Sequence, residues 1–166
     1  DTKEKDKGDI ITVEDYENFE LVLEWKISKN GNSGIMFGVV ESPDLFAPYL
    51  TGPEMQIVDN TGHPDGRIEK HRSGDLYDMI SCEFVTANPA GEWNKIRLIK
   101  KGNKVEQWQN GYKLVEYEMF GEEWKALVEK SKFKDWKEFG KHTKGKLCLQ
   151  DHGNEVWFRN IKIKRL

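Results

Sequence analysis

The chain has 166 residues, a length that predicts one domain with a hydrophobic core of its own. Its formal net charge is -3, and its lysines and arginines are mixed with acidic residues, which argues against a nucleic-acid-binding surface. No apolar run approaches the length of a membrane span, so we expect no transmembrane segment.

The first eight residues form a charged run without an apolar anchor. We expect residues 1–8 to be a frayed or disordered terminus and residues 9–166 to form a single domain. The chain begins at Asp1 with neither a methionine nor a signal peptide, so we expect a processed or trimmed protein. The two cysteines, Cys82 and Cys148, could form one disulfide or remain separate thiols, and the sequence leaves both alternatives open.

Alternating apolar and polar residues predict a series of short strands. The clearest run is 19–26, and the dipeptide Asn110-Gly111 is the strongest hairpin signal because both residues tolerate positive φ. Turn-separated strands at this spacing predict an all-β fold, an antiparallel β-sandwich or jelly roll. The further strands expected are 35–40, 55–58, 93–100, 105–109, 112–117, 146–150 and 156–164, and the core residues expected are Leu21, Leu23, Trp25, Met55, Ile57, Leu147 and Leu149.

One segment, about 122–139, interrupts this β pattern. Its apolar residues fall at helical spacing in two groups, which predicts one or two short amphipathic helices inserted between strands. Such helices must bury their apolar side, so we expect the insert to cover an open end of the sandwich. We expect one end of it, near Trp124, to reach the rim of a cleft.

A polar cleft is predicted by the run G-P-E-M-Q-I-V-D-N, residues 52–60. Because side chains alternate between the two faces of a strand, Glu54 and Gln56 share one face and Met55 and Ile57 share the other. Three further segments, 31–37, 71–77 and 149–153, also set functional side chains beside glycine, where backbone can approach a ligand closely. Together they predict a polar cleft on the open face of a sheet.

Five motifs in a fixed order carry a family resemblance. They are G-N-S-G-I from residue 31, G-P-E-M-Q-I-V-D-N-x-x-H-P-D from 52, P-A-G-E-W-N from 89, V-E-Q-W-Q-N-G from 105 and L-Q-D-H-G-x-x-V-W-F-R-N-I from 149. From Asp9 to Leu166 the chain closely resembles the 3-keto-disaccharide hydrolase family. The resemblance implies a concanavalin A-like β-sandwich, a carbohydrate substrate, and an exported bacterial protein that is periplasmic or secreted. It also implies a polar or basic residue where this chain has Gly38, and that departure should enlarge or weaken the pocket.

The implied reaction is cleavage of glycosides already oxidised at C3, by elimination or by elimination followed by hydration. A ketone at C3 acidifies the C2 proton, so a base can form an enolate that expels the group at C1. Such a site needs a base near C2, a donor or cation near the keto oxygen, and an acid near the leaving oxygen.

Four side chains are the catalytic candidates, each weighed against a plainer interpretation. Glu54 could be the base or could accept hydrogen bonds from substrate hydroxyls. The plainer interpretation is a solvated acid on the surface. His71 could move a proton and Arg72 could stabilise the enolate. The plainer interpretation is that both residues belong to a basic turn that faces solvent. His152 could also be catalytic, because it falls on the same side of its strand as Gln150. The plainer interpretation is a passive histidine on the surface.

The substrate-binding candidates are Gln56, Asp59, Tyr77, Gln150 and Trp124. Tyr77 and Trp124, together with Tyr49, are the expected platforms for sugar rings. The other tryptophans in strand patterns, Trp93, Trp108 and Trp157, are expected in the core.

No cofactor is certain from the sequence. Asp59-Asn60 with His63 and Asp65 could bind a divalent metal, although we favour a hydrogen-bonded turn there. The leading functional hypothesis is an enzyme, and the alternative is a non-catalytic, lectin-like carbohydrate-binding module, since fold does not fix function. A structural or interaction domain is a third, weaker alternative, and the oligomeric state is not predicted.

Overall fold

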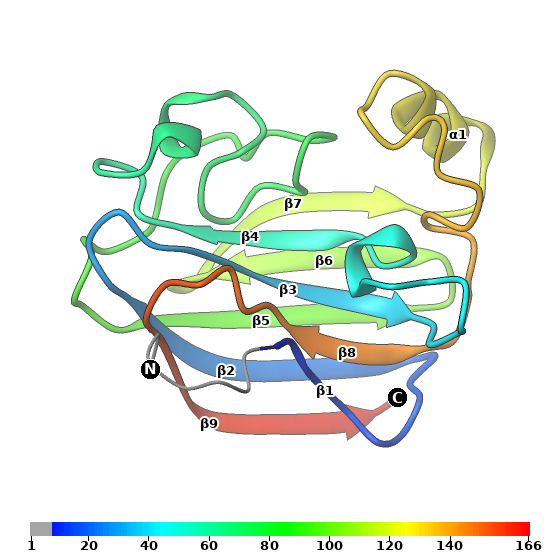
Figure 1. Cartoon of the computed structure of the whole chain (residues 1–166), viewed down its shortest axis with the longest axis horizontal. Helices are drawn as coiled ribbons and strands as arrows, with labels where there is room; N and C mark the ends of the chain where they lie inside the picture. The colour runs from blue at the N-terminus through cyan, green and yellow to red at the C-terminus, as the bar shows by residue number, and fades with distance from the viewer. Residues whose placement is uncertain (1–7) are drawn as a thin grey trace.

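Two antiparallel sheets pack face to face in the computed structural model, which describes residues 8–166 (Figure 1). One sheet has four strands in the order β1-β8-β3-β4, and the other has five in the order β7-β6-β5-β2-β9. This confirms the predicted antiparallel sandwich. The strands are β1 (Ile10–Ile11), β2 (Phe19–Ile27), β3 (Asn32–Val39), β4 (Glu54–Val58), β5 (Asn94–Lys101), β6 (Lys104–Gln109), β7 (Tyr112–Glu118), β8 (Lys146–Leu149) and β9 (Val156–Arg165), and the helices are α1 (Glu122–Glu129) and the 3-10 turns η1 (Pro48–Leu50) and η2 (Pro64–Arg67).

The core lies between the two sheets and follows the alternation of the sequence. Strand β2 alternates strictly between buried and half-buried residues along its length. Its inward side chains meet those of β3, β4 and β5 in one cluster. Six of the seven predicted core residues are buried, whereas Leu149, the last residue of β8, is half-buried against the same cluster.

The tight turns carry the backbone conformations that their residues favour. Asn110 and Gly111 join β6 to β7 with φ of 50° and 88°, so the predicted hairpin turn is confirmed. Gly38 has φ of 66° and lies where the β3–β8 register shifts between Met36 and Val39. A residue with a side chain would be strained there, so this glycine serves a β-bulge.

The four-stranded sheet combines distant parts of the chain. Strand β8, which begins at Lys146, lies between β1 and β3. Beyond β4 the edge is covered by an irregular segment around Asp75, whose carbonyl accepts from the Gln56 N–H at 3.1 Å. The Tyr77 N–H donates to the Glu54 carbonyl at 3.0 Å, which brings the loop after residue 70 beside β4.

The predicted insert forms one helix followed by turns. Helix α1 lies beyond the end of β7 (Figure 1, upper right). Ser131 follows the end of α1. Its hydroxyl donates to the Val128 carbonyl at 2.7 Å and accepts from the Phe133 N–H at 3.1 Å, which favours a turn after the helix. The second group of apolar residues, up to Phe139, is therefore a compact turn in place of a second helix.

The prediction that three strand tryptophans are core residues is wrong. Trp93 and Trp108 are half-buried and Trp157 is 40% exposed. The Lys26 ammonium lies 4.3 Å from the Trp157 ring centroid and 5.2 Å from that of Trp93. Long cationic side chains cover these rings on the outer face of the five-stranded sheet, which is why they need no place in the core.

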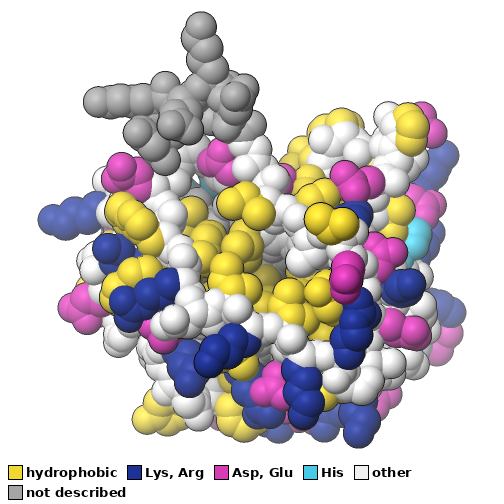
Figure 2. All heavy atoms as spheres, turned by 90° about the horizontal axis from the view of Figure 1, so that it is seen from below, with side chains coloured by type: hydrophobic (Ala, Val, Ile, Leu, Met, Phe, Trp, Pro, Cys, Tyr) yellow, Lys and Arg dark blue, Asp and Glu magenta, His cyan; other side chains and the backbone are white. Residues whose placement is uncertain are grey.

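Strands β1 and β9 form the edges on one side of the sandwich (Figure 1, bottom). Figure 2 shows this side, with apolar side chains gathered in its middle and lysines and arginines around them. Among the described residues, no helix has the length and hydropathy that a membrane span requires.

Cys82 and Cys148 are both buried and free, so the disulfide alternative is wrong. Of the terminus predicted to be frayed, residues 1–7 lie outside the described part of the chain. Gly8 donates its N–H to the Asp151 carboxylate at 3.1 Å.

Candidate active site

A cavity of about 190 Å³ opens on the outer face of the four-stranded sheet. It brings together six parts of the chain: strands β3 and β4, the turn η1, the loop after η2, the turn after α1 and the loop after β8. Its lining residues are Asn32, Tyr49, Glu54, Gln56, Tyr77, Lys132, Phe133, Trp136, Gln150 and His152.

Glu54 is the buried carboxyl of this cavity. Strand alternation turns it away from the core cluster that holds Met55, and the residue is only 8% exposed. Burial raises its pKa from an ordinary 4.5 to about 8, against the opposing effect of the Lys132 cation and with further support from the nearby Asp9 and Asp65 carboxylates. The side chain is therefore a base of unusual strength when it is deprotonated.

Gly34 makes room for the Glu54 carboxyl. It lies on β3, paired in register with Gln56, and a Cβ atom built on it would overlap the Glu54 side chain. The glycine of the G-N-S-G-I segment thus serves the site through close approach, with no left-handed backbone involved.

Three amides line the same cavity. The Gln56 side-chain oxygen accepts from the Ile57 N–H at 3.0 Å, and its nitrogen makes no hydrogen bond within residues 8–166. The Asn32 side-chain oxygen is buried without a hydrogen-bond partner among those residues. Gln150 is held beside them, because its N–H donates to the Gly34 carbonyl at 2.9 Å. A buried amide oxygen without a partner is costly unless a ligand meets it, so the Asn32 side chain is suited to a sugar hydroxyl.

Lys132 supplies the cation of the cavity. Its backbone N–H donates to the Asp78 carboxylate at 2.7 Å, and its ammonium lies 4.1 Å from the centroid of the Tyr77 ring. The Tyr77 hydroxyl in turn donates to Asp65 at 3.4 Å. Burial is the main cause that raises the pKa of Tyr77 above its ordinary value, so its hydroxyl stays protonated. Lys132 lies in a charged stretch with no motif around it, so its sequence context does not predict a place in the site.

Aromatic rings form one wall of the cavity. Trp136 lies 5.6 Å from Tyr49 and 5.0 Å from Phe133, measured between ring centroids. Of these, only Tyr49 was predicted as a platform. The helical spacing of Phe133 and Trp136 pointed to packing, and both residues do pack while also facing the cavity.

Comparison with known proteins places the chain in a family. The model of the 3-keto-alpha-glucoside-1,2-lyase-like domain matches residues 1–164. The chain belongs to this family. A curated relative from Bacteroides thetaiotaomicron, named 3-keto-disaccharide hydrolase, is 37% identical over 187 aligned residues, which take in 100% of this chain and 64% of the relative. The chain thus spans slightly less than two thirds of that relative's length.

Solved structures agree with the family assignment. A crystal structure of a candidate glycosyl hydrolase from Parabacteroides distasonis superposes with a TM-score of 0.91 at 40% identity, covering 95% of this chain and 76% of that one. A Bacillus subtilis protein with a galectin-like fold has a TM-score of 0.59 at 14% identity, covering 95% of this chain and 76% of that one. The second likeness shows the fold alone.

In this member of the lyase-like family, the predicted convergence of six side chains holds for four. Glu54, Gln56, Gln150 and His152 line one cavity, as does the predicted platform Tyr77. His152 is exposed, at the mouth of the cavity. The catalytic and binding roles assigned to these residues stay predictions.

His71 and Arg72 do not line the cavity, and their predicted place in it is wrong. His71 lies behind Tyr77 at 4.4 Å between ring centroids and hydrogen-bonds to Asp78 at 3.0 Å. The Arg72 guanidinium donates to the Ser81 hydroxyl and to the Cys82 carbonyl. Both side chains hold the loop that carries Tyr77, and sequence spacing alone could not separate this task from catalysis.

Asp59 and Trp124 also lie outside the cavity. Asp59 accepts hydrogen bonds from the N–H groups of Asn30 and Thr61; burial opposes its ionisation, but these bonds hold its pKa below the ordinary value. Trp124 is buried, stacks on Tyr117 at 5.7 Å and donates its indole N–H to the Gly140 carbonyl at 3.2 Å. The expectation that the Trp124 end of the insert reaches the cleft is wrong, because the opposite end does so.

Two further expectations concern metal binding and Gly38. Within residues 8–166, no cluster of three or more histidine, cysteine, aspartate or glutamate side chains has the arrangement of a metal site. His63 instead accepts the Asp65 N–H at 3.1 Å, as in the favoured hydrogen-bonded turn. Gly38 serves the β3 bulge and is not among the residues that line the cavity, and its expected effect on the pocket stays a prediction.

Proposed function

We propose that this chain cleaves glycosides that carry a ketone at C3, by proton abstraction at C2 followed by loss of the group at C1. The observation that carries the proposal is the buried Glu54 carboxyl, with a pKa of about 8, in one cavity with a cation and an imidazole. A catalytic base works best when its pKa lies near the working pH, and a carboxyl of ordinary pKa is a weak base for a carbon acid.

In the proposed reaction the Glu54 carboxylate takes the C2 proton. The electrons of the C2–H bond form an enolate, whose oxygen is stabilised by the Lys132 ammonium. The enolate then expels the C1 oxygen, a C1=C2 bond forms, and His152 donates a proton to the departing oxygen. Addition of water across the new double bond gives net hydrolysis.

The cavity supports an enzyme over a lectin-like module. Ionisable groups from β4, from the turn after α1 and from the loop after β8 converge in it, whereas a sugar-binding surface needs mainly amides and aromatics. The name of the relative from Bacteroides thetaiotaomicron supports the same substrate class. We also propose that the protein acts outside the cytoplasm, in the periplasm or after secretion.

The test is turnover of a 3-keto-disaccharide beside the unoxidised sugar, in D2O. We expect cleavage of the oxidised sugar alone, with deuterium at C2 of the hydrated product. Glu54→Gln should lower kcat by about a hundredfold or more, because it removes the base. The matched control is Glu118→Gln, an exposed acid of β7 outside the cavity.

The pH profile gives a second reading of the same experiment. Because the base must be deprotonated, kcat/KM should rise as the pH approaches 8. Equal cleavage of both sugars, or product without deuterium at C2, would contradict the proposed chemistry.

A further inference from the structure

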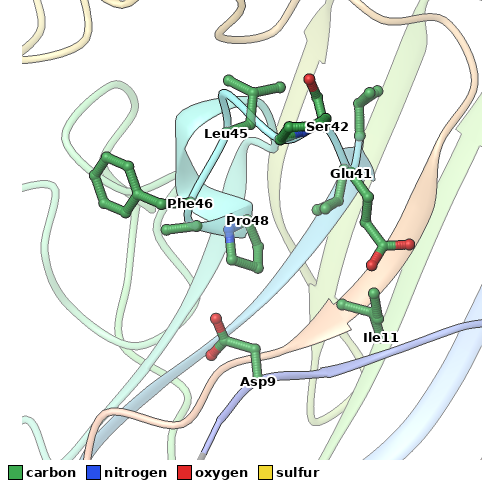
Figure 3. Close-up of a pocket in the computed structure, with 11 residues that line it drawn as sticks. Asp9, Ile11, Glu41, Ser42, Leu45, Phe46 and Pro48 are labelled. Atoms are coloured by element: carbon green, nitrogen blue, oxygen red, sulfur yellow. The ribbon is translucent and has the colours of Figure 1, made fainter.

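A second carboxylate, that of Asp9, lies on the sheet face that carries Glu54. Asp9 comes directly before β1 and is half-buried. It lines a hollow of about 520 Å³ between β1, the end of β3 and the loop that leads into η1. Figure 3 shows its carboxylate pointing to the same side as the Ile11 side chain, toward this space. Asp9 takes no part in the reaction steps proposed above.

The pairing of the strands places the two acids on one face. A row of paired residues crosses the four-stranded sheet from β1 to β4, and its members are Ile11, Cys148, Met36 and Glu54. Asp9 lies two residues before Ile11 and therefore shares its face. Burial raises the pKa of the Cys148 thiol, and the Asp9 and Glu54 carboxylates add to this rise. Both acids thus lie close to the same stretch of β8.

One oxygen of Asp9 is fixed and the other is open. The Asp151 N–H donates to Oδ1 of Asp9 at 2.8 Å, and the Gly8 N–H donates to the Asp151 carboxylate at 3.1 Å. Oδ2 of Asp9 makes no hydrogen bond within residues 8–166. A carboxylate oxygen that is oriented in this way is suited to accept a proton from water.

Asp9 borders the side of the cavity where the leaving group departs. Asp151, which holds it, directly precedes His152, and His152 is the acid proposed for the departing oxygen. Tyr49 of the cavity meets Phe46 of the hollow at 6.2 Å between ring centroids, so the two spaces adjoin. Water that enters through the hollow therefore approaches C1 past the Asp9 carboxylate.

His152 is less well ordered for the activation of water. Its side chain is exposed and makes no hydrogen bond to any residue that the structure describes. A base acts best when a further group fixes its orientation. Asp9 has such a group in the Asp151 N–H, so the geometry favours Asp9 over His152 for this step.

We infer that Asp9 is the base of the hydration step, which decides whether the chain releases an unsaturated sugar or a hydrolysed one. The inference rests on the proposed function, because it starts from the C1=C2 product of the elimination. The Asp9 carboxylate takes a proton from water while the water oxygen bonds to C1. The C1=C2 electrons move toward the C3 ketone and form an enolate, which takes a proton at C2 from the protonated Glu54. Asp9 then releases its proton to solvent, and both carboxylates are restored.

The test measures hydration apart from elimination. Its substrate is the unsaturated 3-keto sugar with a C1=C2 bond, prepared chemically, and loss of the conjugated absorbance measures hydration. Asp9→Asn should slow hydration by about a hundredfold, because an amide cannot take the proton. The same variant should still release methanol from methyl 3-keto-α-glucoside and accumulate the unsaturated sugar. The control is Asp44→Asn, an exposed acid of the loop that leads into η1, which should hydrate as the unaltered chain does.

A purely structural task for Asp9 gives a different pattern. Asparagine keeps the oxygen that accepts from Asp151, so Asp9→Asn would then hydrate normally, and only Asp9→Ala would lose hydration and elimination together. Normal hydration by Asp9→Asn, or none by the unaltered chain, would overturn the inference even if methanol is released. An unaltered chain that hydrates the unsaturated sugar but releases no methanol would contradict the proposed function instead, and the Asp9→Asn rate would still decide the inference.

Discussion

Glu54 shows how one buried side chain can link activity to stability. In the unfolded chain its pKa is the ordinary 4.5, whereas in the folded chain it is about 8. Between these two values the folded protein keeps a proton that the unfolded chain releases. Stability contributed by this group is therefore complete below about pH 4.5 and is lost as the pH rises towards 8.

This linkage predicts a difference between Glu54→Gln and the unaltered chain. The free energy of unfolding of the unaltered chain should fall relative to that of the variant, by up to about 1.4 kcal/mol per pH unit, between pH 5 and 8. Urea unfolding at a series of pH values measures both. Parallel curves for the two proteins would show that the Glu54 pKa is not raised.

Gly34 is the residue that gives the Glu54 carboxyl its place. In Gly34→Ala the new methyl group overlaps that side chain, which is flexible and must move into the cavity. We expect kcat for the 3-keto-glycoside to fall at least tenfold while the melting temperature changes little. The comparison variant is Gly91→Ser, where a side chain meets open space but φ is 90°, so that stability falls and kcat does not. A Gly34→Ala enzyme of full activity would remove Gly34 from the site.

The turn after α1 and the loop that carries Tyr77 depend on each other. Asp78 joins them, because one of its oxygens accepts from the Lys132 N–H and the other meets His71. The Lys132 ammonium then reaches the cavity without any helix to hold it.

We therefore expect Asp78→Ala to loosen the turn after α1. Hydrogen exchange should speed up at residues 131–136, and kcat should fall together with it. Asp135→Ala, an exposed acid of the same turn, is the control and should change neither. Faster exchange without loss of kcat would separate Lys132 from the chemistry.

The strands could be predicted well from the sequence, because burial of one face of a strand makes apolar and polar residues alternate along it. Glu54 and Gln56 could be assigned to an open face for the same reason. The contributions of Lys132, Phe133 and Trp136 could not be predicted, since their positions follow from tertiary contacts with Tyr49 and Asp78. His71 and Arg72 look like catalytic residues in sequence, and only the fold shows that they support a loop.

The long strand β9 forms an exposed edge of the five-stranded sheet. Most of its ten residues are exposed, and it carries Arg159, Lys162, Lys164 and Arg165. The pairing with β2 shifts between Val22 and Glu24, which interrupts the regular edge. Charges and irregularities of this kind keep edge strands from pairing with other chains.

We expect the double variant Lys162→Gln/Lys164→Gln to self-associate more readily than the unaltered chain. Light scattering over a range of protein concentrations measures this. Lys125→Gln/Lys130→Gln removes the same net charge from exposed sites on α1 and at its C-cap, and should not self-associate, because α1 contacts β7 at the opposite edge of the sheet. Equal association of the two double variants would assign the effect to net charge instead of the edge.

The interleaving of the four-stranded sheet has a consequence for synthesis of the protein. Strand β3 lies between β4 and β8 in this sheet, and the cavity is complete only with Gln150 and His152. A chain still attached to the ribosome therefore has Glu54 long before it has a site to hold it. We therefore expect that nascent chains ending before His152 do not bind a sugar in this cavity.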